Sequence, residues 1–360
     1  MPLVANSLLP TFTRLREEGD TVLDPARARQ QDIREMHIGL LNMMPDAALE
    51  ATERQFLRIV SESNQIAQFY IHLFTLPQLQ RGEKAAAHIR QYYETFDTIK
   101  AEGLDALIIT GANVTQPNLA DEAFWEPLIE VIDWGYNNVT SILCSCLATH
   151  AVVQFRHQQK RKKLAEKCWG VFQHEVIDRF HPLVSDINTR FNVPHSRYNE
   201  ITQQQFEEAG LRVLVASPDA GVHLAVSEDL FRIVYFQGHP EYDINSLLKE
   251  YKREVLLFID DKRDDYPPFP HDYFSRQVQA ILLEHKSRLL KAKARKAPLP
   301  TFPEELIRSR LHNTWHDTGE AMINNWIGRV YQTTNSDRKK RFMLGIDPDD
   351  PLGIRYTRSE

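Results

Sequence analysis

Cysteine is scarce in this chain, which has only three, Cys144, Cys146 and Cys168, among 360 residues. So few cysteines cannot build the disulfide framework typical of small secreted proteins. They also lack the Cys-x-x-Cys pairs and the mixed Cys/His spacing of a zinc site, so we predict no metal centre. Free thiols persist in a reducing compartment, and we therefore expect a cytoplasmic protein.

Long apolar runs and an excess of positive charge are also missing. No run of about eighteen apolar residues occurs, and the first residues, Met1 to Asn6, lack the basic leader and apolar core of an export signal. The formal net charge of -6 gives no overall attraction to nucleic acid or to an anionic membrane. We therefore predict neither partner. Two basic stretches, 160–163 and 286–296, are either solvated faces or a contact surface for an anionic cofactor.

Apolar, strand-like runs alternate with segments of helical period, which predicts an α/β fold with a mostly parallel sheet. The division we expect is an N-terminal arm (1–35), an α/β catalytic domain (36–265) and a helical C-terminal extension packed on that domain (266–360). We expect strands at 37–41, 67–74, 105–110, 139–145, 213–216, 222–226 and 232–236, and helices at 49–60, 89–99, 121–136, 147–153, 274–296 and 322–330.

Cys146 lies between an apolar, β-branched run, 139–145, and a segment of helical period, 147–153. A strand that turns directly into a helix presents one side chain at the turn, beside backbone N–H groups and the positive end of the helix dipole. These groups stabilise a thiolate, so Cys146 is the candidate nucleophile. A lone cysteine in an apolar run is more often a small core residue, and we assign that role to Cys144.

A candidate base for this thiol lies in the segment Phe-Gln-Gly-His-Pro-Glu-Tyr-Asp at 236–243. His239 precedes a proline, which favours extended backbone, so His239 and Glu241 can project to the same side of the chain. The carboxylate of Glu241 could then orient the imidazole, which would move protons to and from the nucleophile.

These residues belong to a longer series of motifs in a defined order. The series is Leu41-Asn42-Met43-Met44-Pro45, Thr110-Gly111-Ala112, the strand into Cys146, Glu166-Lys167 with Gly170-Val171-Phe172 and His174, Pro194-His195-Ser196-Arg197-Tyr198, Gly238-His239-Pro240-Glu241-Tyr242-Asp243, and Glu250 with Arg253. It resembles the homoserine O-acyltransferases of the homoserine O-succinyltransferase family over roughly residues 35 to 335. One Gly-His-Pro-Glu would be weak evidence, whereas the ordered set is specific.

The resemblance implies a fold similar to class I glutamine amidotransferases, a flavodoxin-like arrangement. It also implies transfer of an acyl group from acyl-CoA to the hydroxyl of homoserine, an early step towards methionine. Acyl-CoA is then a co-substrate, no further cofactor is expected, and the family suggests a homodimer. By resemblance, Cys146 accepts the acyl group, His239 is the general base and acid, and Glu241 orients it.

The same resemblance implies that Lys167 and Ser196 contact the acyl group or substrate, and that Arg253, with Glu250, holds the amino-acid part of homoserine. Elementary chemistry agrees, because a carboxylate and an ammonium group are complemented by Arg253 and Glu250 paired on one helix face. An acyl-cysteine divides the reaction into two transfers and predicts ping-pong kinetics.

Each transfer forms an oxyanion, for which we predict the backbone N–H groups of Leu147 and Ala112 as donors. Two departures from the family limit the assignment. Leu147 follows the nucleophile where many members have tryptophan, and no lysine follows Pro45 within 46–50. That lysine's role is either unfilled or taken by another group.

Acyl choice in the family is linked to a position shortly after Thr-Gly-Ala, where glycine accompanies succinyl and glutamate accompanies acetyl donors. This chain has Thr115 there. Threonine is small and neutral, and its hydroxyl can donate a hydrogen bond to a carboxylate, so succinyl-CoA is favoured over acetyl-CoA.

Three alternatives stay open on the sequence. They are a homoserine or serine O-acetyltransferase that uses acetyl-CoA, a cysteine-dependent amidotransferase-like hydrolase, and a non-catalytic protein that retains the scaffold. The last is disfavoured because the trio Cys146, His239 and Glu241 is intact.

Overall fold

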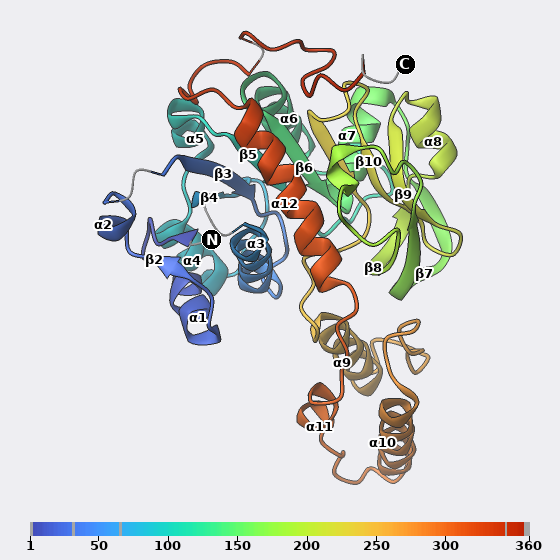
Figure 1. Ribbon diagram of the computed structural model, residues 1–360. Helices are drawn as coiled ribbons and strands as arrows, with labels where there is room; N and C mark the ends of the chain where they lie inside the picture. The colour runs from blue at the N-terminus through green and yellow to red at the C-terminus, as the bar shows by residue number, and fades with distance from the viewer. Residues whose placement is uncertain (1–2, 31–32, 65–66, 343, 356–360) are drawn as a thin grey trace.

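The computed structural model of the chain describes residues 3–30, 33–64, 67–342 and 344–355. Figure 1 shows that a mixed β-sheet forms its centre. Within these ranges the sheet has eleven strands in the order β2-β1-β4-β3-β5-β6-β11-β10-β9-β7-β8. Neighbours from β2 to β11 in this order pair in parallel, and those from β11 to β8 pair antiparallel. The predicted α/β class with a mostly parallel sheet is confirmed.

The strands and helices have the following bounds. The strands are β1 (Leu3–Val4), β2 (Val22–Leu23), β3 (Glu35–Leu41), β4 (Gln68–Phe74), β5 (Ala106–Ile109), β6 (Ser141–Ser145), β7 (Lys162–Val176), β8 (Arg190–Glu200), β9 (Arg212–Ser217), β10 (Gly221–Val226) and β11 (Ile233–Phe236). The α-helices are α1 (Pro10–Glu18), α2 (Pro25–Ala28), α3 (Leu49–Ser63), α4 (Glu83–Tyr92), α5 (Phe96–Glu102), α6 (Trp125–Asn138), α7 (Leu147–His157), α8 (Gln203–Glu208), α9 (Ser246–Ile259), α10 (Arg276–Ala294), α11 (Glu304–Arg308) and α12 (His316–Thr333).

The central strands agree with the prediction because parallel strands covered on both faces are continuous apolar runs. Every residue of β5 and β6 is buried. The prediction of a single helix at 89–99 was wrong. The chain forms two helices there, because α4 ends at Tyr92 and Thr95 starts α5 by accepting a hydrogen bond from the N–H of Thr98.

The sequence does not predict β7 and β8, and it shows no strand in the N-terminal arm. The first seven residues of β7 are exposed or half-buried, the next four are all buried, and only the last four alternate, so no regular period marks the whole strand. In the arm, β1 and β2 add to the sheet beside β4. Two-residue strands are too short to show a period.

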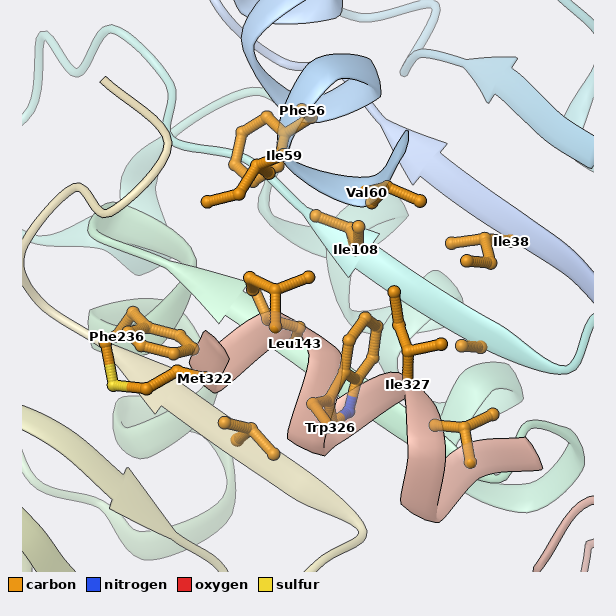
Figure 2. Close-up of a cluster of buried hydrophobic side chains, with 14 of the residues drawn as sticks. Ile38, Phe56, Ile59, Val60, Ile108, Leu143, Phe236, Met322, Trp326 and Ile327 are labelled. Atoms are coloured by element: carbon orange, nitrogen blue, oxygen red, sulfur yellow. The ribbon is translucent and has the colours of Figure 1, made fainter. Parts of the chain in front are cut away.

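Helices cover both faces of the parallel part of the sheet. The first face is covered by α3 and α12, and the opposite face by α6 and α7. Figure 2 shows Trp326 and Ile327 of α12 beside Leu143 of β6 and Ile108 of β5. The indole of Trp326 is buried and donates a hydrogen bond from Nε1 to Ser141 Oγ at 2.8 Å. The last long helix is therefore part of the central core.

The helices α9, α10 and α11 gather beyond one end of the sheet in Figure 1. They share an apolar cluster of their own, which includes Tyr251 of α9, Leu282 of α10, Ile307 of α11 and Trp169 of β7. The division at 35 and 265 stays a prediction, and residues 1–2, 31–32, 65–66, 343 and 356–360 of these segments lie outside the described residues. Within the described ranges, none of the helices has the length and apolar content that crossing a bilayer requires.

Candidate active site

Cys146 lies at the turn between β6 and α7, where the sequence places it. Its backbone φ is 50° and its ψ is -102°, a conformation that non-glycine residues rarely adopt. The N–H of Cys146 donates to the carbonyl of Phe236, the last residue of β11, at 2.8 Å. Such a sharp strand-to-helix turn presents a nucleophile at the edge of an α/β sheet.

Thr149, one turn into α7, holds this strained turn in place. Its Oγ1 lies 3.1 Å from the carbonyl oxygen of Cys144 and 2.8 Å from that of Phe236, so its hydroxyl bridges the ends of β6 and β11. These two strands are adjacent and parallel. The strand that carries the cysteine and the strand that leads to His239 are therefore tied together at the site.

His239 is buried. Its Nδ1 lies 2.8 Å from Glu241 Oε1, and the side chain of Cys146 is close enough to act on its imidazole. Burial by itself lowers the pKa of His239, but the carboxylate of Glu241 and the sulfur of Cys146 together raise it to about 10. A histidine with this pKa is protonated at neutral pH and can donate its proton to a departing group.

Glu241 is itself buried and belongs to a small polar network. Its Oε1 accepts from His239 and from Ser145 Oγ at 3.5 Å, while Oε2 is buried without a partner among the described residues. The ring of Tyr242 stacks on that of His239, with centroids 4.3 Å apart. The imidazole is thus fixed by a carboxylate at one edge and an aromatic ring on one face.

A second carboxylate, the half-buried Glu250 of α9, accepts hydrogen bonds from three donors on separate segments. Its Oε2 accepts from Lys167 Nζ of β7 at 3.1 Å and from Ser196 Oγ of β8 at 2.6 Å, and its Oε1 accepts from the hydroxyl of Tyr242 at 3.0 Å. Burial raises the pKa of Glu250, but Lys167 and the hydrogen bonds of Ser196 and Tyr242 outweigh it and lower the pKa. Lys167 and Ser196 therefore meet at Glu250.

Arg253 forms no ion pair with Glu250, and the role of the two residues in holding the amino-acid part of homoserine stays a prediction. Its guanidinium lies 3.4 Å from Glu254 instead, and its side chain is 61% exposed. The reason is that both oxygens of Glu250 already accept hydrogen bonds from Lys167, Ser196 and Tyr242. Arg253 is left facing solvent and the cavity described next.

A cavity of about 250 Å³ lies beside His239, Glu241 and Glu250, whereas Cys146, Lys167 and Ser196 are not among its lining residues. One wall is apolar and comes from α3 and the loop before it, and the other carries charge from α9 and the segment 239–242. The lining residues are Met44, Ala47, Ala48, Ala51, Thr52, Gln55, Phe56, Thr110, Gly111, Ser145, His239, Glu241, Tyr242, Ser246, Lys249, Glu250 and Arg253. A small amino acid could contact His239 and the two charged residues of α9 together.

Sequence reasoning missed two of these lining residues. Tyr242 lies in the Gly-His-Pro-Glu-Tyr-Asp motif, from which only the histidine and the glutamate were predicted as site residues. Lys249 had no signal, yet it lines the same cavity as Ala47 and Ala48, which come just after the Met-Pro element where the family's lysine is missing. Lys249 is a candidate for that unfilled role.

The remaining predicted residues lie around the Cys146 turn. Gly111 lines the cavity, and Ala112 follows it, half-buried. Leu147 is the first residue of α7, so its N–H has no partner within the helix. Thr115 is exposed and does not line the cavity; its N–H donates to Glu122 Oε1 at 2.5 Å, and its Oγ1 lies 3.3 Å from Glu122 Oε2.

The fold and this geometry define an α/β protein with a candidate cysteine nucleophile beside a histidine–glutamate pair. The sequence model of the family "homoserine O-succinyltransferase" matches residues 2–336. Curated proteins named homoserine O-succinyltransferase from Nitrosococcus oceani and Allochromatium vinosum are 66% and 64% identical to this chain, and each alignment covers at least 98% of both proteins. One from Cardiobacterium hominis is 50% identical over 98% of this chain and 99% of its own length.

The chain belongs to the homoserine O-succinyltransferase family, and it is an acyltransferase. The predicted family and enzyme class are confirmed. Similar solved structures include a glutamine amidotransferase from Thermotoga maritima, 11% identical over 83% of this chain and 98% of that one, with a TM-score of 0.42. Another is a glutamine amidotransferase from Methylobacillus flagellatus, 10% identical over 82% and 95%, also with a TM-score of 0.42.

Proposed function

We propose that this chain transfers the succinyl group of succinyl-CoA to the hydroxyl of L-homoserine, in methionine biosynthesis, through an acyl-enzyme at Cys146. The observation that carries the proposal is the buried contact of His239 with both Cys146 and Glu241, in a member of this family. The name shared by its full-length relatives supports the substrates.

In the first half-reaction, the thiolate of Cys146 attacks the thioester carbonyl of the donor. The bond between the carbonyl carbon and the CoA sulfur then breaks, and the imidazolium of His239 protonates the departing CoA thiolate. A histidine whose pKa is raised to about 10 holds that proton at neutral pH. The products are CoA and a succinyl-cysteine.

In the second half-reaction, His239 is neutral and acts as a base. It takes the proton of the homoserine hydroxyl, whose oxygen attacks the acyl-cysteine, and the thiolate of Cys146 leaves. The imidazolium–thiolate pair is restored. In both steps the N–H groups of Leu147 and Ala112 are our candidates to stabilise the oxyanion.

Substrate binding is assigned to the cavity beside His239. Arg253 lines it, is not paired with Glu250, and would hold the carboxylate of homoserine, while Glu250 would attract the ammonium group. Lys167 and Ser196 donate hydrogen bonds to Glu250, so they would hold the Glu250 carboxylate in place for the substrate.

The donor preference rests on the succinyl transfer that the relatives' names state. Thr115 gives it no support, because its hydroxyl already lies against the carboxylate of Glu122. Acetyl-CoA is the alternative donor, and serine the alternative acceptor. The amidotransferase-like hydrolase has no such support in the named relatives.

Three further expectations remain proposals. The scheme moves every proton with His239, so acyl-CoA serves as a co-substrate and the scheme calls for no added cofactor. We propose a cytoplasmic location, where a reducing environment keeps the thiol of Cys146 free. We also propose the homodimer that the family suggests.

Intact-mass measurement after brief exposure to succinyl-CoA, without acceptor, tests the proposal. We expect a mass increase of one succinyl group, which maps to Cys146 and disappears when L-homoserine is added. A chain that transfers succinyl groups without ever carrying one would contradict the mechanism. Parallel incubations with acetyl-CoA and with L-serine separate the alternatives.

A further inference from the structure

Arg161 is a cation near the nucleophile to which the scheme above gives no role. It lies in the basic stretch 160–163, just before β7, and is half-buried. Its Nη2 donates to the carbonyl of Gln116 at 3.3 Å, and its Nε is buried without a hydrogen-bond partner among the described residues. Within the same ranges no carboxylate lies within salt-bridge distance of it. A guanidinium in this state has unused donors.

Its surroundings place it on the nucleophile's side of the protein. Burial lowers the pKa of Arg161, while the charges of Glu122 and of the Cys146 sulfur raise it, so both groups are close enough to act on the guanidinium. Its partner Gln116 belongs to the loop that follows the Gly111-Ala112 turn. Another residue of that loop, Asn118, accepts a hydrogen bond from Gln154 of α7, the helix that Cys146 begins.

The nearby anion, Glu122, is already committed to the loop. Its Oε1 accepts from the N–H groups of Thr115 at 2.5 Å and of Gln116 at 2.7 Å, and its Oε2 lies 3.3 Å from the hydroxyl of Thr115. Glu122 and Arg161 therefore both hydrogen-bond the segment 115–116. The Nε of Arg161 stays available to an anion bound near Cys146.

We propose that Arg161 binds the distal carboxylate of a dicarboxylic acyl group while the carbonyl end of that acyl group is bonded to Cys146. This inference rests on the proposed function and names the group that would select the donor. The carboxylate of a succinyl group stands two methylene groups beyond the reacting carbonyl. A guanidinium binds a carboxylate through paired N–H donors, so Arg161 would favour succinyl over a neutral acyl group of similar size.

Two other roles for Arg161 make different predictions. A contact with the phosphates of CoA would serve every acyl-CoA equally, because all donors share that part. A purely structural brace for the 115–116 segment would also act on every donor. Only recognition of the distal carboxylate separates charged from neutral acyl groups.

The test compares single-turnover acylation of Cys146 by succinyl-CoA and by butyryl-CoA, whose acyl chain lacks the carboxylate, using intact mass as the readout. Arg161→Met keeps a long side chain without charge, and Arg161→Lys keeps the charge without the planar fork. Lys162→Ala, which removes an exposed cation at the next position, is the matched control.

We expect Arg161→Met to lower the acylation rate with succinyl-CoA roughly 10- to 100-fold and to leave the rate with butyryl-CoA nearly unchanged. Arg161→Lys should fall between, and Lys162→Ala should match the unaltered chain. An equal loss of acylation rate with both donors, or no loss with succinyl-CoA, would overturn the role of Arg161 and leave the proposed function standing. An unaltered chain that forms no adduct with succinyl-CoA would overturn the proposed function, and the inference with it.

Discussion

His239 and Glu241 are separated by a single residue in the chain, and their side chains meet at 2.8 Å inside the protein, both less than a tenth exposed. The predicted extended backbone is wrong here: Pro240 and Glu241 form a turn that the N–H of Tyr242 closes onto the carbonyl of His239 at 3.2 Å, and this turn brings the two side chains together. This pair sets the proton affinity on which the proposed transfer depends.

Glu241→Gln should move the alkaline limit of activity to lower pH. Glu241 raises the pKa of His239, so an uncharged amide in its place lets the imidazolium lose its proton at a lower pH. Acylation needs that proton for the departing CoA thiolate, so the rate should fall below that of the unaltered chain first on the alkaline side. The pH dependence of succinyl-CoA acylation, followed by released thiol, measures this. Ser145→Ala, which removes only the long contact at 3.5 Å, is the control, and coincident profiles would contradict the prediction.

Cys146→Ala should lower acyl transfer by roughly 10³-fold or more, because the acyl-enzyme cannot form, and His239→Ala should be comparably damaging. Cys144→Ser and Cys168→Ser should retain most activity. Burial raises the pKa of the Cys144 thiol, so it stays neutral and inert. Steady-state rates with succinyl-CoA and L-homoserine give the comparison. Substantial turnover by the Cys146→Ala variant would reject the covalent mechanism.

Arg253→Ala should raise the KM for homoserine by about 10-fold and leave the acylation rate nearly unchanged, because the guanidinium would contact only the acceptor. Arg263→Ala is a matched control. Arg263 binds the same carboxylate, Glu254, at 2.9 Å, but it does not line the cavity. An unchanged dependence on homoserine concentration in the Arg253 variant would count against its role.

Trp326→Ala should lower the free energy of unfolding by ~3–5 kcal/mol, because it leaves a void in the core between α12 and the sheet. Ser141→Ala removes the hydroxyl that accepts the indole N–H at 2.8 Å and should cost about 1 kcal/mol. Urea denaturation gives both values. Leu283→Ala, at a position that is 54% exposed, should change stability by less than about 0.5 kcal/mol. A Trp326 variant as stable as the Leu283 variant would show that α12 is peripheral.

Much of the site could be predicted because it depends on neighbours in the chain. The turn at Cys146 follows from an apolar strand run directly before a helical segment. The His239–Glu241 contact could be predicted from their nearness in the chain, although a turn and not extended backbone makes it. The partners of Glu250 could not be predicted in this way. Helical spacing pointed to Arg253, whereas the donors are Lys167 and Ser196, which come from strands distant in sequence.

Local periodicity and residues a few positions apart are enough to predict the parallel strands, the turn that exposes Cys146 and the pairing of His239 with Glu241. They do not predict that β7 and β8 pair and bring Lys167 and Ser196 to Glu250, or that Arg161 contacts the loop beyond Ala112. Those contacts join segments far apart in the chain. Long-range pairing and burial choose them, and no local pattern encodes either.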